Sequence, residues 1–266
     1  MDDKERKQKE AGYYDKRAED YLKILKNKPG QAFEKFDPFY LESYNFLRDF
    51  LRPICVSKKI LDYGCGSGVH SLWMAKSGAD VKAIDLSAGF LSIAKDKIIK
   101  ERLQDRVEFL LMDCEKLNFP ENYFDIIFDG GTFSSLDFEK VMIELSRVLK
   151  PGGFVAGIET LGHNPIANLR RKFNKLAGRR TNWVTNHVFK IDYLNLAKKY
   201  FNRVEAYYFH SISWLAFPFL NLPGGTILLK FFENIDHLLI SVFPFFKKYS
   251  FKIVFIFSEP KNEAHI

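Results

Sequence analysis

The segment DYGCGSG contains three glycines at a spacing that is typical of a loop whose backbone binds a ligand. Gly64, Gly66 and Gly68 follow a short apolar run and precede a helix-like segment. Glycine allows a sharp turn and a close approach of the backbone to a ligand, and a helix that begins there directs its free amide groups at that ligand. The loop therefore predicts a nucleotide-type binding site.

Two acids follow at the ends of the next apolar runs. Asp85 stands about twenty residues after the first glycine, and Asp113 follows the third run. An acid at the first position can accept hydrogen bonds from both ribose hydroxyls, and a second acid can accept one from an adenine amine. Either acid could instead cap a helix or a turn. Val69 stands where a dinucleotide-binding loop has its third glycine, and the P-loop lysine is absent, so the pattern suits S-adenosylmethionine.

The runs that position these residues alternate between strand-like and helix-like patterns. Short Val-, Ile- and Phe-rich runs predict strands, and apolar residues at spacings of three and four predict helices. We predict strands at 59–63, 80–84, 107–111, 125–128, 154–158, 203–209 and 251–257, and helices at 69–77, 89–102, 138–149 and 192–200. The alternation predicts an α/β fold with a doubly wound, mostly parallel sheet.

Four segments together resemble the class I S-adenosylmethionine-dependent methyltransferases, in particular the broad group that includes the ubiquinone and menaquinone biosynthesis methyltransferases. They are ILDYGCGSG, VKAIDLS, DCEKLNFPENYFDIIF and ELSRVLKPGGF, and they span about 60–159. The resemblance implies a seven-stranded Rossmann-like sheet with a reversed last strand, for which FKIVFIF is the candidate. It also implies S-adenosyl-L-methionine as the cofactor, and we expect no metal.

The resemblance assigns parts of the cofactor to individual residues. The methionyl part would be held by Asp62 and the loop 64–68, the ribose by Asp85, and the adenine by Asp113 with Cys114. No activated thiolate is expected, because nothing near the cysteines would lower a thiol pKa. The predicted cofactor-binding set is Asp62, Gly64, Cys65, Gly66, Gly68, Asp85, Leu86, Asp113, Cys114 and Asp129.

Candidates for catalysis follow the fourth and fifth predicted strands. A sulfonium is a good leaving group, so the enzyme must align the acceptor, exclude water and, for a hydroxyl, remove a proton. Glu159, His163 and His187 are the candidate bases or substrate ligands, although each histidine could serve only local hydrogen bonds. The segment FDGGTFSSL lacks the Asn/Asp-Pro-Pro-aromatic signature of relatives that methylate planar amines, which disfavours that reaction.

The rest of the chain predicts a lid and two insertions. Residues 1–57 form aromatic helices that would close over the cofactor, with Tyr14 as a candidate substrate-binding residue or a packing residue. Residues 58–266 form the S-adenosylmethionine-binding domain, with insertions at about 160–190 and 210–250. The charged N-terminus has no apolar signal core, and three cysteines lack metal spacing, so we expect a cytoplasmic protein, with a peripheral position at the inner face of a membrane as one interpretation.

The excess of positive charge lies mainly in one run. The net charge is +7, and LRRKFNKLAGRRT contains six Lys or Arg and no acid. This run could be a solvated helix face, a phosphate-binding patch or a contact with an anionic membrane. Arg170 and Arg171 are its candidate substrate-binding residues.

The apolar insertion Trp214 to Phe246 predicts helices rather than a transmembrane hairpin, because prolines, glycines and charges interrupt it. The helices could bury their apolar stripe against their own domain, cap an acceptor pocket or touch a bilayer. Charged and polar residues fall mainly outside the predicted stripe, which consists of Leu228, Phe231, Phe232, Ile235, Leu238, Leu239 and Val242.

These features favour a methyltransferase that acts on a small or lipid-linked acceptor, with O-methylation by in-line transfer and a His or Glu base. An RNA methyltransferase is an alternative supported by the charge, but the aromatic residues are concentrated in apolar runs rather than among the basic ones, which makes a nucleic acid the less favoured partner. A non-catalytic cofactor-binding protein that docks on membranes or partners is the other alternative.

Overall fold

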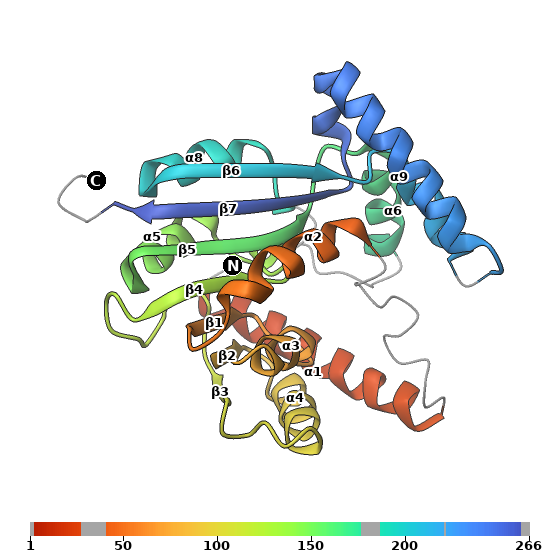
Figure 1. Cartoon of the computed structure of the whole chain (residues 1–266). Coiled ribbons are helices and arrows are strands. Elements are labelled where there is room, and N and C mark those ends of the chain that lie inside the picture. The colour runs from red at the N-terminus through yellow and green to blue at the C-terminus, as the bar shows by residue number, and fades with distance from the viewer. Residues whose placement is uncertain (1–2, 28–40, 177–186, 221, 262–266) are drawn as a thin grey trace.

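A computed structural model describes residues 3–27, 41–176, 187–220 and 222–261 of the chain (Figure 1). A seven-stranded sheet with the order β3-β2-β1-β4-β5-β7-β6 forms its centre. β7 is antiparallel to β5 and to β6, and the other pairs are parallel. The strands are β1 Lys59–Tyr63, β2 Asp80–Asp85, β3 Val107–Leu111, β4 Phe124–Asp129, β5 Leu149–Thr160, β6 Phe201–Phe209 and β7 Lys252–Pro260.

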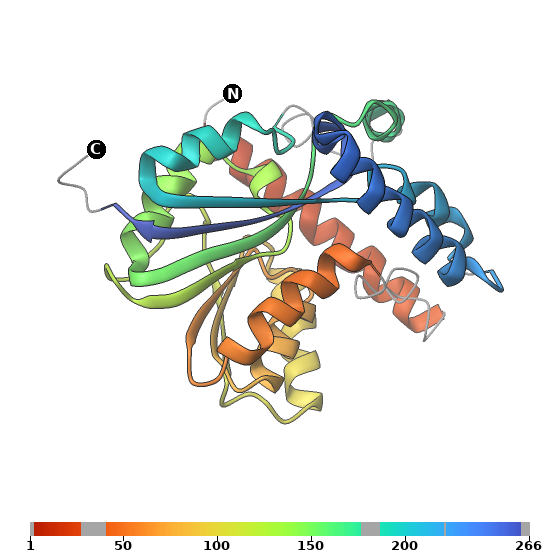
Figure 2. The same ribbon diagram turned by 45° about the horizontal axis from the view of Figure 1, so that its top comes forward.

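Helices cover both faces of the sheet (Figure 2). One face packs against α2, α3 and α4, and the other packs against α5 and α8, because each of these helices contributes apolar residues to one of two buried clusters. The bounds are α1 Asp3–Asn27, α2 Glu42–Leu51, α3 Val69–Lys76, α4 Ala88–Lys100, α5 Phe138–Val148, α6 Pro165–Leu176, α8 Asp192–Tyr200 and α9 Gly225–Val242. The 3₁₀ helices are η3 Arg52–Ile54, η4 Phe133–Ser135, η5 Ser213–Phe219 and η6 Pro244–Tyr249.

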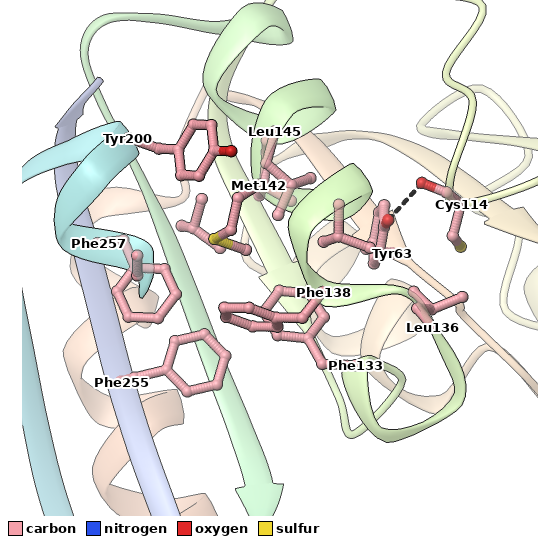
Figure 3. Close-up of a cluster of buried hydrophobic side chains, with 14 of the residues drawn as sticks. Tyr63, Cys114, Phe133, Leu136, Phe138, Met142, Leu145, Tyr200, Phe255 and Phe257 are labelled. Atoms are coloured by element: carbon pink, nitrogen blue, oxygen red, sulfur yellow. Dashed lines mark hydrogen bonds between the residues drawn. The ribbon is translucent and has the colours of Figure 1, made fainter. Parts of the chain in front are cut away.

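The core between the sheet and α5 is built from stacked aromatic rings (Figure 3). Phe255 lies 5.3 Å from Phe133 and 4.6 Å from Phe257, measured between ring centroids, and all three side chains are fully buried. Offset and edge-on ring contacts of this kind add to the free energy of apolar burial. The Tyr63 hydroxyl donates to the Cys114 carbonyl, which ties the end of β1 to the segment after β3. The aromatic residues of β7 therefore belong to the core.

The predicted fold class is confirmed, including the reversed last strand. The predicted strands and helices all occur, and the largest shift in a boundary is in β5. That strand begins at Leu149 rather than at residue 154, because Leu149 already pairs with Phe124 before a register shift. Periodicity located the elements well, since the buried strands have strongly apolar sequences.

The predicted apolar stripe of α9 is divided in the structure between a half-buried part and an exposed part. The structure places Phe231, Leu238 and Val242 on the exposed side, at exposures above one half, whereas Leu229 and Asp236 are buried. The Asp236 carboxylate accepts hydrogen bonds from the amides of Ile212 and Ser213, at 2.7 and 3.1 Å, and so satisfies the backbone at the start of η5. Asp236 faces the domain because its carboxylate caps the buried start of η5.

Among the described helices, none has the length and the apolar character needed to cross a membrane.

Candidate cofactor and acceptor site

The glycine loop has three residues in the left-handed backbone region. Gly64, Gly66 and Gly68 have φ angles of +70°, +50° and +71°, which side chains other than hydrogen rarely accommodate. An added Cβ at Gly64 would lie 2.2 Å from Thr132 Oγ1, and one at Gly68 would lie 2.7 Å from the Cβ of Ala94. At Gly66 an added Cβ would have no heavy atom of the described segments within 4 Å. Gly64 and Gly68 are thus required by packing, whereas Gly66 borders open space.

Asp85 is joined directly to this loop. Its Oδ2 accepts a hydrogen bond of 2.8 Å from the Gly66 amide, and its Oδ1 accepts one of 2.9 Å from the Ser87 amide. Burial raises the pKa of Asp85, although these amide donors oppose the shift. The carboxylate is half-buried at the carboxyl end of β2, as is the next residue, Leu86. Asp85 therefore orders the loop and still presents a carboxylate beside it.

Asp62 in β1, Cys65 in the glycine loop and Cys114 after β3 are all buried. Asp62 accepts a hydrogen bond from the Ser71 hydroxyl, and burial raises its pKa to about 7. Burial also raises the thiol pKa values of Cys65 and Cys114 well above the usual value. Neutral thiols of this kind are poor nucleophiles. A role for the cysteines would accordingly lie in their backbone groups, and the assignment of Asp62 to the methionyl part stays a prediction.

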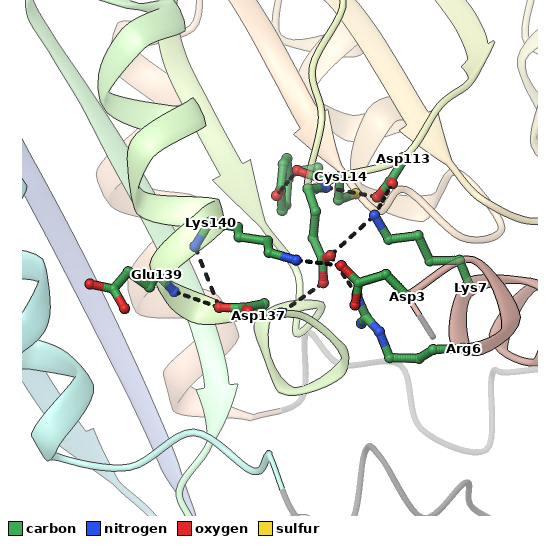
Figure 4. Close-up of polar contacts among 10 residues, drawn as sticks. Asp3, Arg6, Lys7, Asp113, Cys114, Asp137, Glu139 and Lys140 are labelled. Carbon is green, nitrogen blue, oxygen red and sulfur yellow. Dashed lines mark hydrogen bonds and ion pairs between the residues drawn. The ribbon is translucent and has the colours of Figure 1, made fainter. Parts of the chain in front are cut away.

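Asp113 and its neighbour Glu115 meet the first turns of α1 (Figure 4). Lys7 forms an ion pair with Asp113, and Arg6 Nη2 lies 2.5 Å from Glu115 Oε2. The Arg6 and Glu115 side chains are almost fully buried, whereas Lys7 and Asp113 are about one quarter exposed. Asp113 lies at the end of β3, as the sequence predicts for an adenine contact, and that contact stays a prediction.

The rest of α1 crosses the ends of the neighbouring strands. Asp15 Oδ1 accepts hydrogen bonds from the Ser87 hydroxyl and the Gly89 amide after β2, and the Tyr14 hydroxyl lies 3.1 Å from Ser135 Oγ after β4. Together with the contacts after β3, these bonds place α1 over the edge where the parallel strands end. This position supports the predicted lid segment, and Tyr14 is near the predicted acceptor side.

Two buried carboxylates lie at the ends of β4 and β5. Asp129 Oδ1 accepts from the Thr132 amide at 2.8 Å, and Glu159 accepts from the Ser134 amide and hydroxyl at 3.0 and 2.9 Å. The Thr132 hydroxyl in turn donates to the Tyr63 carbonyl at 3.1 Å, which ties residues 130–135 to the glycine loop. Asp129 Oδ2 is buried and has no hydrogen-bond partner among the described residues.

Both carboxylates have pKa values above the usual range. Burial is the main cause for each; repulsion by Glu159 raises the pKa of Asp129 further, and Lys252 acts in the opposite direction on both. Two acids in one buried site cannot both ionise freely. Each carboxylate of the pair therefore binds a proton more readily than an exposed carboxylate does.

The described hydrogen bonds of the other predicted catalytic and substrate residues do not include Asp129 or Glu159. His163 Nε2 accepts from the Ile191 amide at 3.3 Å, and His187 is half-buried. The buried guanidinium of Arg171 donates to Asn168 Oδ1 and to the Leu161 carbonyl, contacts that stabilise α6. The Arg170 side chain lies outside the described part of the structure.

His70 was not among the predicted site residues. It stacks on Tyr44 and contacts Phe128, with ring centroids 6.1 and 4.7 Å apart, and its Nε2 would lie 3.2 Å from a Cβ added at Gly130. Burial lowers its pKa to about 4, with Lys252 contributing. His70 is thus a neutral imidazole between the glycine loop and the segment after β4. The sequence feature that could have identified His70 is its position in GSGVH, two residues after the last glycine of the loop.

The sheet order, the glycine loop and the acid after β2 define an α/β nucleotide-cofactor site of the methyltransferase type. The described residues fit S-adenosylmethionine because Gly66 leaves room for a ligand and Asp85 presents a carboxylate beside it. Residues 61–157 match the family model described as "Methyltransferase domain".

Two curated methyltransferases are similar in sequence to this chain. The methyltransferase GfsG of Streptomyces halstedii is 39% identical over 105 residues, which are 39% of this chain and 38% of that protein. The demethylmenaquinone methyltransferase of Listeria welshimeri serovar 6b is 26% identical over 219 residues, which are 77% of this chain and 85% of that protein. This chain thus spans well under half of the first relative and most of the second.

A solved structure shares the fold. Phosphoethanolamine N-methyltransferase 2 of Haemonchus contortus, in complex with phosphomonomethylethanolamine and S-adenosylhomocysteine, aligns with a TM-score of 0.60 and 22% identity over 83% of this chain and 52% of that chain. Residues 61–157 are thus similar in sequence to a methyltransferase domain, and the sheet agrees with that of the solved methyltransferase. These similarities support the class I S-adenosylmethionine-dependent methyltransferases, which the motifs predicted, and S-adenosyl-L-methionine as the cofactor.

Proposed function

We propose that this protein transfers a methyl group from S-adenosylmethionine to a small or lipid-linked acceptor, at a hydroxyl oxygen. The observation that carries the proposal is the buried pair Asp129 and Glu159, hydrogen-bonded to a segment that is tied to the glycine loop. When bound, the cofactor supplies an electrophilic methyl group on a sulfonium. The similarity to a demethylmenaquinone methyltransferase supports a lipid-linked acceptor.

The chain's own part in this reaction is to position the reactants and accept a proton. Gly66 and Asp85 would hold the cofactor, and α1 would exclude water from the same edge of the sheet. Of the three candidate bases, Glu159 has the strongest support. It is buried, its pKa is raised and it is bonded to the Ser134 hydroxyl, through which a proton from the acceptor could pass.

The two histidines have less support as bases. His163 already accepts a backbone amide at Nε2, which points to a role in holding the chain after α6. Arg171 is likewise engaged within and next to α6, so a structural role is better supported for it than substrate binding. The contact of the Tyr14 hydroxyl with Ser135 supports a position for Tyr14 beside the acceptor.

Cofactor binding is tested with a pair of variants on one strand. Asp85→Asn keeps the size of the side chain but weakens its ability to hold ribose hydroxyls, and we expect at least tenfold weaker binding of S-adenosylhomocysteine in calorimetric titration. Asp80→Asn, at the other end of β2 where Asp80 pairs with Arg106, is the control and should bind as the unchanged protein does. Equal affinity in all three proteins would contradict the assignment of Asp85.

Methyl transfer is tested with labelled S-adenosylmethionine and a lipid extract or a set of small hydroxylated compounds. Glu159→Gln should lose most of the activity but keep its affinity for S-adenosylhomocysteine, because the amide cannot take the proton. His163→Ala and His187→Ala should retain activity if Glu159 is the base. Full activity of Glu159→Gln would refute its role, and mass spectrometry of the product would show whether the methyl group is on oxygen.

A further inference from the structure

The surface around α9 exposes an unusual amount of apolar area. Ile227 is 75% exposed, Leu238 is 65% exposed, and Phe231 and Phe245 are 59% exposed. Scattered exposed apolar residues are normal, but a contiguous set marks an interaction surface. We define the α9 apolar face as Ile227, Phe231, Leu238 and Val242 of α9 together with Phe243 and Phe245, which follow it.

The spacing of the α9 residues makes this a single face. Ile227, Phe231, Leu238 and Val242 are separated by four, seven and four residues, which places them above one another on a helix. The opposite side of α9 packs on its own domain through Leu229, which clusters with Phe217 and Leu41. α9 therefore has two apolar sides. One packs on the domain, and the other is not buried by any described residue.

The acids of this region lie on the side of α9 that packs on the domain. From Ser211 to Ser250 the sequence contains two acids, Glu233 and Asp236. Asp236 is buried and caps η5, and Glu233 accepts a bond from the Glu42 amide with only 13% of its side chain exposed. Both acids thus point toward the domain, and the α9 apolar face is left without a carboxylate of its own helix.

Basic residues remain on the outside. Lys230 is exposed beside the α9 apolar face, and Lys247 and Lys248 are exposed in η6, directly after Phe243 and Phe245. Exposed apolar side chains with lysines around them and the acids turned away match a surface of apolar chains under anionic head groups. A second copy of this chain would instead bring like charges together across a twofold axis.

The topology sets this surface on the same edge of the sheet as the cofactor loop. β6 runs parallel to β5 because each is antiparallel to β7, so η5, α9 and η6 connect β6 to β7 at the edge where β1 and β2 end (Figure 1). A membrane on the α9 apolar face would therefore lie on the side from which a lipid-linked acceptor could arrive.

We propose that the α9 apolar face, with Lys230, Lys247 and Lys248, docks on a bilayer that contains anionic phospholipid. The proposal concerns where the protein binds, and it holds whichever acceptor is methylated. Apolar side chains would enter the interface while the lysines reach phosphate oxygens.

The test is sedimentation of the full chain with vesicles of phosphatidylcholine, with and without phosphatidylglycerol. We expect binding to the anionic vesicles that weakens as salt is added. The variant Ile227→Ser/Phe231→Ser/Leu238→Ser should lose at least tenfold in partitioning. Lys247→Gln/Lys248→Gln should lose roughly fivefold for each lysine at low salt, from about 1 kcal/mol per charge near the surface.

A control variant removes three other exposed apolar side chains far from α9 in the sequence. Val56→Ser/Ile99→Ser/Ile143→Ser changes residues on the loop before β1, on α4 and on α5, and should sediment as the unchanged protein does. S-adenosylhomocysteine titration of each variant confirms an intact cofactor site. Absence of sedimentation at low salt, or unchanged sedimentation of the α9 variant, would overturn the proposal. So would a dimer in analytical ultracentrifugation that the α9 variant loses, because a second copy would then cover the face.

Discussion

Gly66→Ala separates a role in ligand binding from a role in folding. The added methyl group meets no heavy atom of the described residues within 4 Å, so the fold can hold it without a clash there. Its remaining cost is the left-handed backbone at φ +50°, about 1–2 kcal/mol for a residue with a Cβ. This cost is partly offset, since alanine restricts the unfolded chain more than glycine does.

Gly152→Ala is a close control for this change. Gly152 has φ +80°, and an added Cβ there also meets nothing within 4 Å. It lies near the start of β5, at the opposite edge of the sheet from the glycine loop. Each variant should therefore lose about 1 kcal/mol of stability, which lowers the melting temperature by roughly 2–4 °C for a domain of this size.

Only Gly66→Ala should lose the cofactor. A methyl group in the open space beside the Gly66 amide keeps the ligand from close contact with the loop, and we expect S-adenosylhomocysteine to bind at least tenfold more weakly, a loss of about 1.4 kcal/mol. Calorimetric titration and thermal melts of the two variants give both quantities. An unchanged dissociation constant for Gly66→Ala, or an equal loss for Gly152→Ala, would refute the reasoning. Gly64 and Gly68 are unsuitable for this test because their substitutions clash with the protein itself.

Two further predictions concern stability. Arg6→Met leaves the buried Glu115 carboxylate without its guanidinium and should cost about 3 kcal/mol in chemical denaturation, whereas Lys7→Met, at a partly exposed pair, should cost about 1 kcal/mol or less. Burial raises the pKa of Glu233 to about 7, so ionising it opposes folding, and the free energy of unfolding should fall between about pH 5 and pH 8. Glu233→Gln should remove up to about 3 kcal/mol of that fall in melts at the two pH values. The rest should remain, because the pKa of Asp62 is also about 7 and those of Asp85, Asp129 and Glu159 are raised as well.

The sequence predicted the sheet and the cofactor loop because both depend on local patterns. Buried parallel strands are continuous apolar runs, and an acid that ends such a run must lie at the carboxyl edge. Asp85 and Asp113 were located in this way, each within one or two residues of a strand end. Glycines at φ values above zero are likewise visible in sequence, because few other residues adopt them.

The missed features depend on contacts between distant segments. The pairing of Lys7 with Asp113 joins residues 106 positions apart, and no periodicity encodes it. Asp236 faces the domain because the amides at the start of η5, more than twenty residues earlier, bind its carboxylate, and the spacing within α9 does not show this contact. His70 follows the glycine loop in an ordinary helix start, and only the approach of Tyr44 and Phe128 shows that it is enclosed.

The reversed last strand explains how one edge of this sheet can hold both a cofactor site and a large apolar insertion. Because β7 is antiparallel to β6, the chain can return into the sheet without a crossover, and any added length between Phe209 and Lys252 must extend from the carboxyl edge. The loops that we expect to hold the cofactor follow β1, β2 and β3, at the other end of the strand order. A helix such as α9 can therefore be added beside the acceptor side while the glycine loop and Asp85 keep their geometry. On this basis, substitutions on the exposed side of α9 should change what the enzyme docks on, and substitutions at Gly66 should change whether it binds its methyl donor.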